Sequence, residues 1–594
     1  MKKPHKYNMG LIGNCSYIAY IDDTANVKWM CMPRFDSSFI FGSLLDEDKG
    51  GEFSIKPAVE KYVSKQYYLE NTNILVTEFS ASDGKFRVID YAPRFYQYDR
   101  YFKPYMLCRK IELISGRPFI NIKCRPVDDY GKITPEITMA SNHIRYLNVG
   151  HVVRLTTDIP VNFILNESSF VLSTNKYLIF TYGEHLEASL QETAEKFLDK
   201  TKNYWTTWVK STSIPNIYQK EIIRSALVLK LHQYEDTGGI IASGSTSLPE
   251  ENQTGRNWDY RYCWMRDTYY TLTAFNSIGH FEELEKYFNF IENIILNNAD
   301  ERIQPLYSIT GEKIVAERNL ELKGYYGNVP VRIGNDAYTH IQNDVYGQLL
   351  VSLLPIYTDL RLNLKFKKKS IDIVKLLLKK IEITINEPDA GLWEFRNQKQ
   401  QHCYTYLFHW AGSKAAMKIF NLINDKQMEA HAFNLANLAA RNIEACYNDT
   451  KKAYTQAIGI DSLDASCMQL ITMNYLDHNS QRTENHLKAI EKELMTKSGL
   501  FFRYRHKDDF GIPKNSFLIC SFWYIESLAC LNKIDEAVKC LDGLLKFSNH
   551  LGLFSEDIDP DGGQWGNFPQ TYSHVGLMNA VFRISKKLDS PIYL

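Results

Sequence analysis

The sequence lacks a net charge, because its 69 Lys and Arg residues are balanced by 69 Asp and Glu residues. A balanced chain has no overall field to attract nucleic acid or an acidic membrane, so neither is an expected partner. It also lacks a run of about 18 apolar residues, the length that a membrane-spanning helix needs. The apolar stretch near residue 10 is interrupted by Asn14 and stopped by Asp22, which makes it a poor signal peptide. These absences predict a soluble, cytoplasmic protein.

The 11 cysteines lack the spacings that mark disulfide or zinc sites, since they contain no Cys-x-x-Cys pair and no zinc-type Cys/His pattern. Scattered cysteines are typical of reduced, mainly buried thiols in a cytosolic protein. Cys263 has no histidine near it in the sequence and is not required as a nucleophile. No ligand cluster calls for a metal ion or an organic cofactor, and we predict neither.

The periodicity of the 594 residues changes near residue 185. Before that point, short β-type segments alternate with turn residues; Asp83-Gly84, for example, is typical of a hairpin. Many short strands of this kind predict an antiparallel β-sandwich over residues 1–184. The sequence thus begins with a β domain.

The remainder of the chain has helical spacing. Residues 185–214 predict a linker helix, and residues 215–594 carry apolar positions on one helical face, such as Ile223, Leu227 and Leu231. Nearly 380 helical residues are too many for a four-helix bundle, and no fixed-period repeat is present. A closed helical toroid fits this part better than a simple solenoid.

Two carboxylates stand out because each lies beside aromatic residues in an expected loop. Glu394 occurs in Gly-Leu-Trp-Glu-Phe-Arg and Glu556 in Leu-Phe-Ser-Glu-Asp. Sugar-cleaving enzymes use one carboxylic acid to protonate the departing oxygen and one carboxylate to drive the attack. The pair alone is not diagnostic, since a chain with 69 acidic residues contains such pairs by chance.

Residues 256–267 concentrate four aromatic residues, three arginines and two aspartates in twelve positions. The adjacent Arg266 and Asp267 are able to pair with each other while presenting donors and acceptors to vicinal hydroxyls. A structural salt bridge under an aromatic cluster explains the same residues, so this segment by itself leaves both interpretations open.

In these and other segments the chain resembles glycoside hydrolase family 15, in its bacterial glucoamylase and trehalase-like branch. The resemblance covers nearly the whole chain, and its motifs occur in the family's order: residues 11–16, 29–37, 246–250, 257–267, 324–335, 342–347, 391–396, 555–560, 566–570 and 573–574. It implies an antiparallel β-sandwich followed by an (α/α)6 barrel of twelve helices, with the active site in loops at one end.

The resemblance also implies roles for individual residues. Glu394 matches the general acid and Glu556 the general base. Further residues match positions that hold or line the innermost glucose subsite: Tyr260, Trp264, Arg266, Asp267, Trp393 and Arg505, the last with Arg503 as the alternative because the register is ambiguous by two residues. Three departures from the pattern leave the leaving-group side of the specificity open: Tyr338, Phe395 and Tyr406.

The family inverts the anomeric centre, which requires Glu394 to be protonated and Glu556 ionised. Burial beside Trp393 and Phe395 is expected to raise the pKa of Glu394, whereas a wetter setting is expected to keep Glu556 ionised. The expected activity is exo-acting release of β-glucose from the non-reducing end of α-glucosides such as maltooligosaccharides. A trehalase with the same catalytic pair is the alternative.

Two other classes of function are less consistent with the residues present. A phosphorylase on a similar barrel would replace the base with a phosphate site, and Glu556 is intact. A non-catalytic sugar-binding protein is expected to have lost Glu394, Glu556 or Asp267, and all three are present. The sequence does not indicate an oligomeric state.

Overall fold

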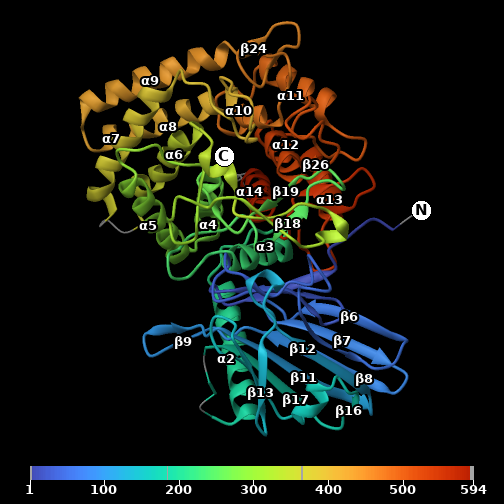
Figure 1. Cartoon of the computed structure of the whole chain (residues 1–594). Helices are drawn as coiled ribbons and strands as arrows, with labels where there is room; N and C mark the ends of the chain where they lie inside the picture. Colours follow the sequence, from blue (N-terminus) through green and yellow to red (C-terminus); the bar gives the residue numbers. More distant parts are fainter. Residues whose placement is uncertain (1–2, 184, 187, 363–365, 589–594) are drawn as a thin grey trace.

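The structure, a computed structural model, describes residues 3–183, 185–186, 188–362 and 366–588. Its helices gather in one part of the molecule and its large sheets in the other (Figure 1). An eight-stranded antiparallel sheet dominates the β part, in the order β13 (Glu136–Met139), β14 (His143–Leu147), β15 (Val153–Thr157), β17 (Lys176–Tyr182), β11 (Met106–Gly116), β8 (Gly84–Tyr91), β7 (Leu75–Ala81) and β6 (Tyr62–Tyr68). The predicted hairpin is confirmed, because Ala81 of β7 pairs with Gly84 of β8.

Two smaller antiparallel sheets share an apolar core with this sheet, which confirms the predicted sandwich. One contains β1 (Met9–Gly13), β2 (Ile18–Asp22), β3 (Val27–Cys31) and β4 (Phe39–Phe41); the other contains β16 (Phe170–Val171), β12 (Phe119–Arg125) and β5 (Glu52–Pro57). Successive side chains of a strand point to opposite faces. Accordingly, Ala19 and Met30 face the sandwich core, whereas Tyr20 and Trp29 join a second core that continues into the helical part. The sandwich and the helices are therefore packed together by apolar contacts.

Six helices form a closed inner ring, since each contacts the next and the last contacts the first: α4 (Thr268–Ile278), α6 (Asp344–Thr358), α8 (Cys403–Leu422), α10 (Gln469–Thr472), α12 (Leu518–Cys530) and α14 (Thr571–Leu588). Six more lie outside it: α3 (Gln219–Leu231), α5 (Phe281–Asn297), α7 (Phe366–Thr384), α9 (Lys426–Glu444), α11 (Gln481–Leu494) and α13 (Ile534–Leu545). This is the predicted (α/α)6 barrel.

The sequence explains which helices lie inside. Every residue of α12 is buried, as expected for a helix that is apolar all round, whereas α13 buries only Ala537, Leu541 and Leu544 along one stripe. Among the described helices, none is both long and apolar enough to cross a bilayer. All 11 cysteines are free thiols and ten of them are buried, as predicted.

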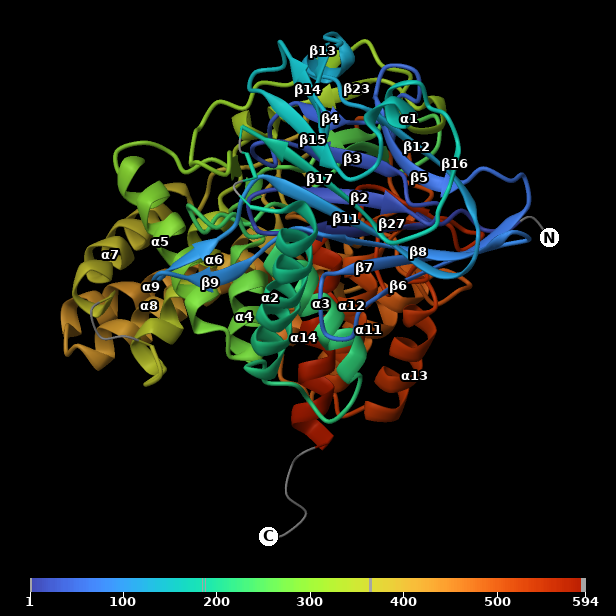
Figure 2. The same cartoon turned by 90° about the horizontal axis from the view of Figure 1, so that it is seen from below.

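The expected connecting helix is α2 (Leu190–Lys210), which packs against β17 and β9 (Phe95–Gln97). It lies below the barrel in Figure 1 and in front of the barrel helices in the view from below (Figure 2). Trp205 and Trp208, near its end, are buried in the core shared with the barrel. Residue 184, the predicted end of the sandwich, lies outside the described residues. The limits 1–184, 185–214 and 215–594 remain our proposal for the domains.

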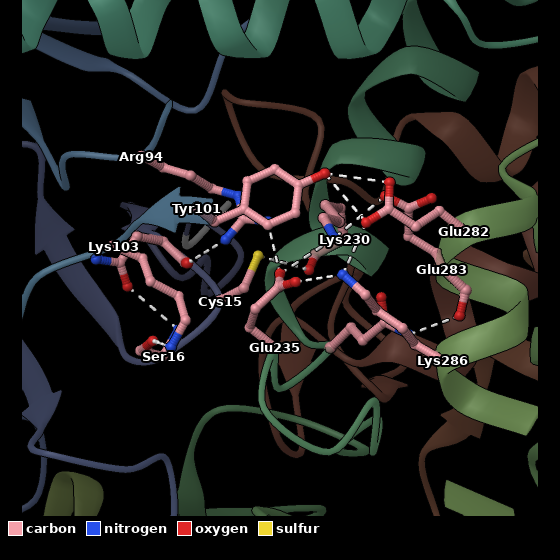
Figure 3. Close-up of polar contacts among 12 residues, drawn as sticks. Cys15, Ser16, Arg94, Tyr101, Lys103, Lys230, Glu235, Glu282, Glu283 and Lys286 are labelled. Carbon is pink, nitrogen blue, oxygen red and sulfur yellow. Dashed lines mark hydrogen bonds and ion pairs between the residues drawn. The ribbon is translucent and has the colours of Figure 1, made fainter. Parts of the chain in front are cut away.

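A buried network of charges joins the sandwich to the barrel (Figure 3). The Glu235 carboxylate is contacted by Arg94 at 2.6 Å, by Lys230 at 3.6 Å and by Lys286. Burial acts to raise the pKa of Glu235, but these three cations outweigh it and lower the pKa to about 2. Glu235 is thus shared by three cations, two of which have a second carboxylate partner: Lys230 pairs with Glu283 and Lys286 with Glu282.

Replacing Glu235 with glutamine is expected to destabilise the protein by about 3–5 kcal/mol, because it leaves the buried Arg94 guanidinium without the carboxylate that it pairs with. Because the pKa of Glu235 is lowered, its contribution to stability depends on pH. The contribution is present above pH 4.5, the ordinary pKa of a glutamate, and is lost as the pH falls toward 2. Urea unfolding at pH 7 and at low pH measures both effects. The control is Glu282→Gln, whose side chain is 55% exposed and pairs with the same Lys286, and for which about 0–1 kcal/mol is expected. Equal losses in the two variants would contradict the interpretation.

Candidate active site

A pocket with about 870 Å³ of empty volume lies at the end of the barrel where loops lead into the inner helices. This volume includes the open solvent at the mouth of the pocket. Asp267 is the residue immediately before α4, and Glu394 lies in the loop before α8. Seven of the predicted site residues line this pocket together: Tyr260, Trp264, Arg266, Asp267, Trp393, Glu394 and Glu556.

The Glu394 carboxylate is held through one of its two oxygens. Its Oε1 accepts hydrogen bonds from Trp264 Nε1 at 2.7 Å, from an Arg266 guanidinium nitrogen at 3.0 Å and from Gln342 Nε2 at 3.2 Å. The backbone at Glu394 has φ +61°, a left-handed conformation that non-glycine residues seldom adopt and that is often found at functional sites. With Oε1 occupied by donors, Oε2 is the oxygen suited to carry a proton and donate it.

Arg266 connects this carboxylate to Asp267, because its Nε donates to Asp267 Oδ1 at 3.2 Å. The predicted pairing of the two neighbours is therefore present, and both side chains remain partly accessible, at 13% and 16%. Burial raises the pKa of Asp267, although Arg266 opposes the shift. The pair presents a donor and an acceptor side by side in the pocket, the arrangement that vicinal hydroxyls require.

The Glu556 carboxyl is 1% exposed and lies immediately before the short strand β27 (Asp557–Ile558). Tyr260 donates its hydroxyl to Glu556 Oε1 at 2.6 Å, and the backbone N–H of Asn567 donates to Oε2 at 3.4 Å. Gly566 packs so closely that a Cβ there would lie 2.6 Å from the Glu556 side chain, so glycine is required. Burial and the nearby Glu250 carboxylate raise the pKa of Glu556 to about 8.

The expected order of the two pKa values is wrong. Burial does act to raise the pKa of Glu394, but Arg266 and the hydrogen-bond donors outweigh it and lower the pKa. Glu556 instead faces other carboxylates, and the cation nearby, Arg503, is paired with Glu250. The roles implied by the family resemblance require the opposite order, with a protonated Glu394 and an ionised Glu556.

Replacing Glu250 with glutamine is expected to shift the acid limb of the kcat/KM profile to lower pH by about one unit or more. A general base acts when ionised, so activity rises with pH as Glu556 loses its proton. Removing the adjacent negative charge lowers the pKa of Glu556, so the rise in activity is expected at lower pH. The matched control is Glu251→Gln, because Glu251 pairs with Lys514 and does not line the pocket. An acid limb that stays in place or moves upward would count against the assignment of Glu556.

The predicted arginine is corrected from Arg505 to Arg503. Arg503 lines the pocket and pairs with Glu250, whereas Arg505 lies in a separate surface hollow with Lys451 and Lys492. These residues are not in a strand, so positions two apart need not share a face. Of the two arginines that the sequence left open, the structure therefore places Arg503 at the pocket.

The sequence analysis missed several residues of the pocket wall. Glu250, Arg256 and Trp258 lie within or beside the motifs already quoted, and their polar and aromatic character was a usable signal. Arg396 and Gln570 also lie within quoted motifs, but no role was assigned to them. No pattern pointed to the others: His340, Tyr504, Asp508, Asp509, Phe510 and Tyr572. Of the three departures from the family pattern, Phe395 lines the pocket, while Tyr338 and Tyr406 are not among its lining residues.

Residues 564–566, which lie beside Glu556, are held by residues close to the start of the sequence. The backbone N–H of Gln564, in β28 (Gln564–Trp565), donates to the carbonyl of His5 at 2.8 Å. Tyr7 donates its hydroxyl to the Gly566 carbonyl at 3.0 Å. Residues 5–7 therefore form part of the structure on which Glu556 rests.

Two carboxyl groups in one pocket of a helical barrel, one beside an indole and a guanidinium and the other beside a phenol, are the arrangement expected of a glycoside hydrolase. Comparison with known families agrees: the family model described as Glycosyl hydrolases family 15 matches residues 216–537, and that described as Trehalase-like, N-terminal matches residues 4–166. The chain belongs to glycoside hydrolase family 15.

Relatives with established names are similar along their whole length. The trehalase of Thermoplasma volcanium is 32% identical, over 98% of this chain and 93% of that protein. The trehalase of Mycolicibacterium smegmatis is 30% identical, over 97% of this chain and 90% of that protein. A bacterial glucoamylase solved with acarbose superposes with a TM-score of 0.71 over 98% of this chain and 94% of that one; at 14% identity, this likeness shows the fold alone.

Proposed function

We propose that the protein is a trehalase, which hydrolyses α,α-trehalose with inversion. The observation that carries this proposal is the full-length similarity, at 30% identity or more, to proteins named trehalase. The similarity to a glucoamylase concerns the fold alone. The comparisons therefore favour the alternative reading of the sequence over cleavage of maltooligosaccharides.

In this proposal Glu394 is the general acid and Glu556 the general base. Glu394 Oε2 donates a proton to the oxygen that leaves, while Glu556 accepts a proton from the water that attacks the opposite face of the anomeric carbon. Tyr260, bonded to Glu556 Oε1, fixes the orientation of the base. The Arg266–Asp267 pair holds hydroxyls of the glucose that is attacked, with Trp264 and Trp393 in the wall around it.

The test is NMR of the sugar released from trehalose, followed before mutarotation. Inversion gives one β-glucose, from the carbon that water attacks, and one α-glucose, from the unit that leaves. Retention would give α-glucose alone. Maltose, maltotriose, isomaltose and kojibiose are run in parallel.

Each outcome of this panel has a distinct meaning. Equal α- and β-glucose from trehalose, with little turnover of the other sugars, supports the proposal. β-Glucose from maltooligosaccharides without trehalose turnover would replace the trehalase with a glucoamylase-type enzyme. α-Glucose as the sole initial product would exclude the roles given to Glu394 and Glu556.

A further inference from the structure

A tight turn at residues 508–511, here called the rim turn, forms part of the pocket wall beyond the catalytic pair. Asp508, Asp509 and Phe510 line the pocket. The backbone N–H groups of Asp508 and Gly511 donate to each other's carbonyl oxygens at 3.0 and 3.3 Å. Gly511 has φ +104°, which side-chain-bearing residues avoid. Ile512, the next residue, is 58% exposed, so the rim turn has one side on the pocket and one on solvent.

The two aspartates attach the rim turn to opposite parts of the pocket. Asp508 Oδ1 accepts a hydrogen bond from Arg256 at 2.6 Å, in the segment that leads to Tyr260. Asp509 Oδ2 accepts the backbone N–H of Arg396 at 2.7 Å, in the loop that carries Glu394. The rim turn thus connects the first aromatic motif with the loop of the acid.

Phe510 completes an aromatic and cationic surface at this point. Its ring meets Trp258 edge to face, with centroids 5.1 Å apart. The guanidinium groups of Arg332 and Arg396 each lie 4.7 Å from the Trp258 ring centre, and that of Arg256 lies 5.5 Å from the Phe510 ring centre. An aromatic ring among charged donors and acceptors suits a pyranose, which has apolar faces and a rim of hydroxyls.

We propose that the rim turn forms the subsite for the departing glucose, with Phe510 and Asp509 as specificity-determining residues. This inference rests on the proposed function, in which Glu394 protonates the departing oxygen. That oxygen must lie within hydrogen-bond distance of Glu394, so the sugar attached to it lies beside Phe395 and Arg396. Asp509, which holds Arg396, and Phe510, next to it in the chain, are the parts of the rim turn that face this sugar.

The test compares trehalose with α-D-glucosyl fluoride, in which fluoride takes the place of the departing sugar. Phe510→Ala and Asp509→Asn are expected to lower kcat/KM for trehalose by about tenfold or more, because contacts to the departing glucose are lost. For glucosyl fluoride the change is expected to stay within about twofold, since fluoride makes no contact with the rim turn. Ile512→Ala, on the solvent side of the same turn, is the matched control and is expected to alter neither value.

The ratio of the two kcat/KM values separates a role on the side of the departing sugar, which includes positioning of the Glu394 loop through Asp509, from a general loss of structure. Phe510→Ala reports on the subsite, because the hydrogen bond to the Arg396 backbone comes from Asp509. Equal losses on both substrates, or no loss on trehalose, would overturn the proposal. Turnover of glucosyl fluoride without turnover of trehalose by the unsubstituted enzyme would contradict the trehalase assignment. The role of the rim turn is then tested by comparing kcat/KM for glucosyl fluoride with kcat/KM for whichever disaccharide the enzyme cleaves. Inactivity of the unsubstituted enzyme on every substrate would overturn both.

Discussion

Replacing Glu556 with glutamine is expected to lower kcat for trehalose by a factor of about 10²–10⁴. Glutamine keeps the shape of the side chain and an oxygen to accept the Tyr260 hydroxyl, but it cannot take a proton from water. The attack itself is therefore lost, and glucosyl fluoride is expected to suffer as trehalose does, because both need an activated water. Steady-state rates on the two substrates measure this.

The control for this variant is Asp561→Asn, an exposed carboxylate in the turn that follows β27. It is expected to retain full activity. A Glu556→Gln protein that hydrolyses either substrate at more than about a tenth of the normal rate would remove Glu556 from the role of base.

Replacing Glu394 with glutamine is expected to give a different result on the same two substrates. Trehalose hydrolysis is expected to fall by about 10²–10⁴-fold, because the departing sugar oxygen no longer receives a proton. Glucosyl fluoride is expected to be hydrolysed at a rate within about tenfold of normal, since fluoride leaves without protonation. The acid and the base are thus distinguished by one pair of rate measurements.

The matched control is Glu382→Gln, because Glu382 lies on the outer helix α7 with a side chain that is 51% exposed. A Glu394→Gln protein that loses both substrates equally would point to a role in holding Arg266 and Trp264 instead of a role in proton transfer. Loss of neither substrate would exclude Glu394 from catalysis.

The arrangement of layers could be predicted because it depends on local patterns. Alternation along β1–β3 and the all-round apolar character of α12 are properties of short segments. Likewise, Arg266 and Asp267 are neighbours in the chain, so their pairing required no knowledge of the fold. The family resemblance supplied the closure of the helices into a ring.

The electrostatics of the pocket depend on residues that are far apart in sequence, and the prediction failed there. The pKa of Glu556 is raised by burial and by Glu250, and that of Glu394 is lowered through Arg266. The family resemblance places Glu394, Glu556 and Arg266 in one site, but nothing in the sequence places Glu250 beside Glu556 or shows that Arg266 outweighs the burial of Glu394. The rim turn was missed for a similar reason. In the sequence, residues 508–511 have the composition of an ordinary polar turn, and only the structure shows that Arg256 and Arg396 contact them.

The contacts that residues 5–7 make with residues 564–566 have a consequence for protein synthesis. A ribosome releases His5 and Tyr7 hundreds of codons before their partners Gln564 and Gly566. The β domain is complete early, as N-terminal domains usually are during translation. Its first residues, however, can make these contacts only after residues 564–566 have been synthesised. A nascent chain that ends before residue 564 therefore lacks the contacts that tie the start of the β domain to the segment after Glu556.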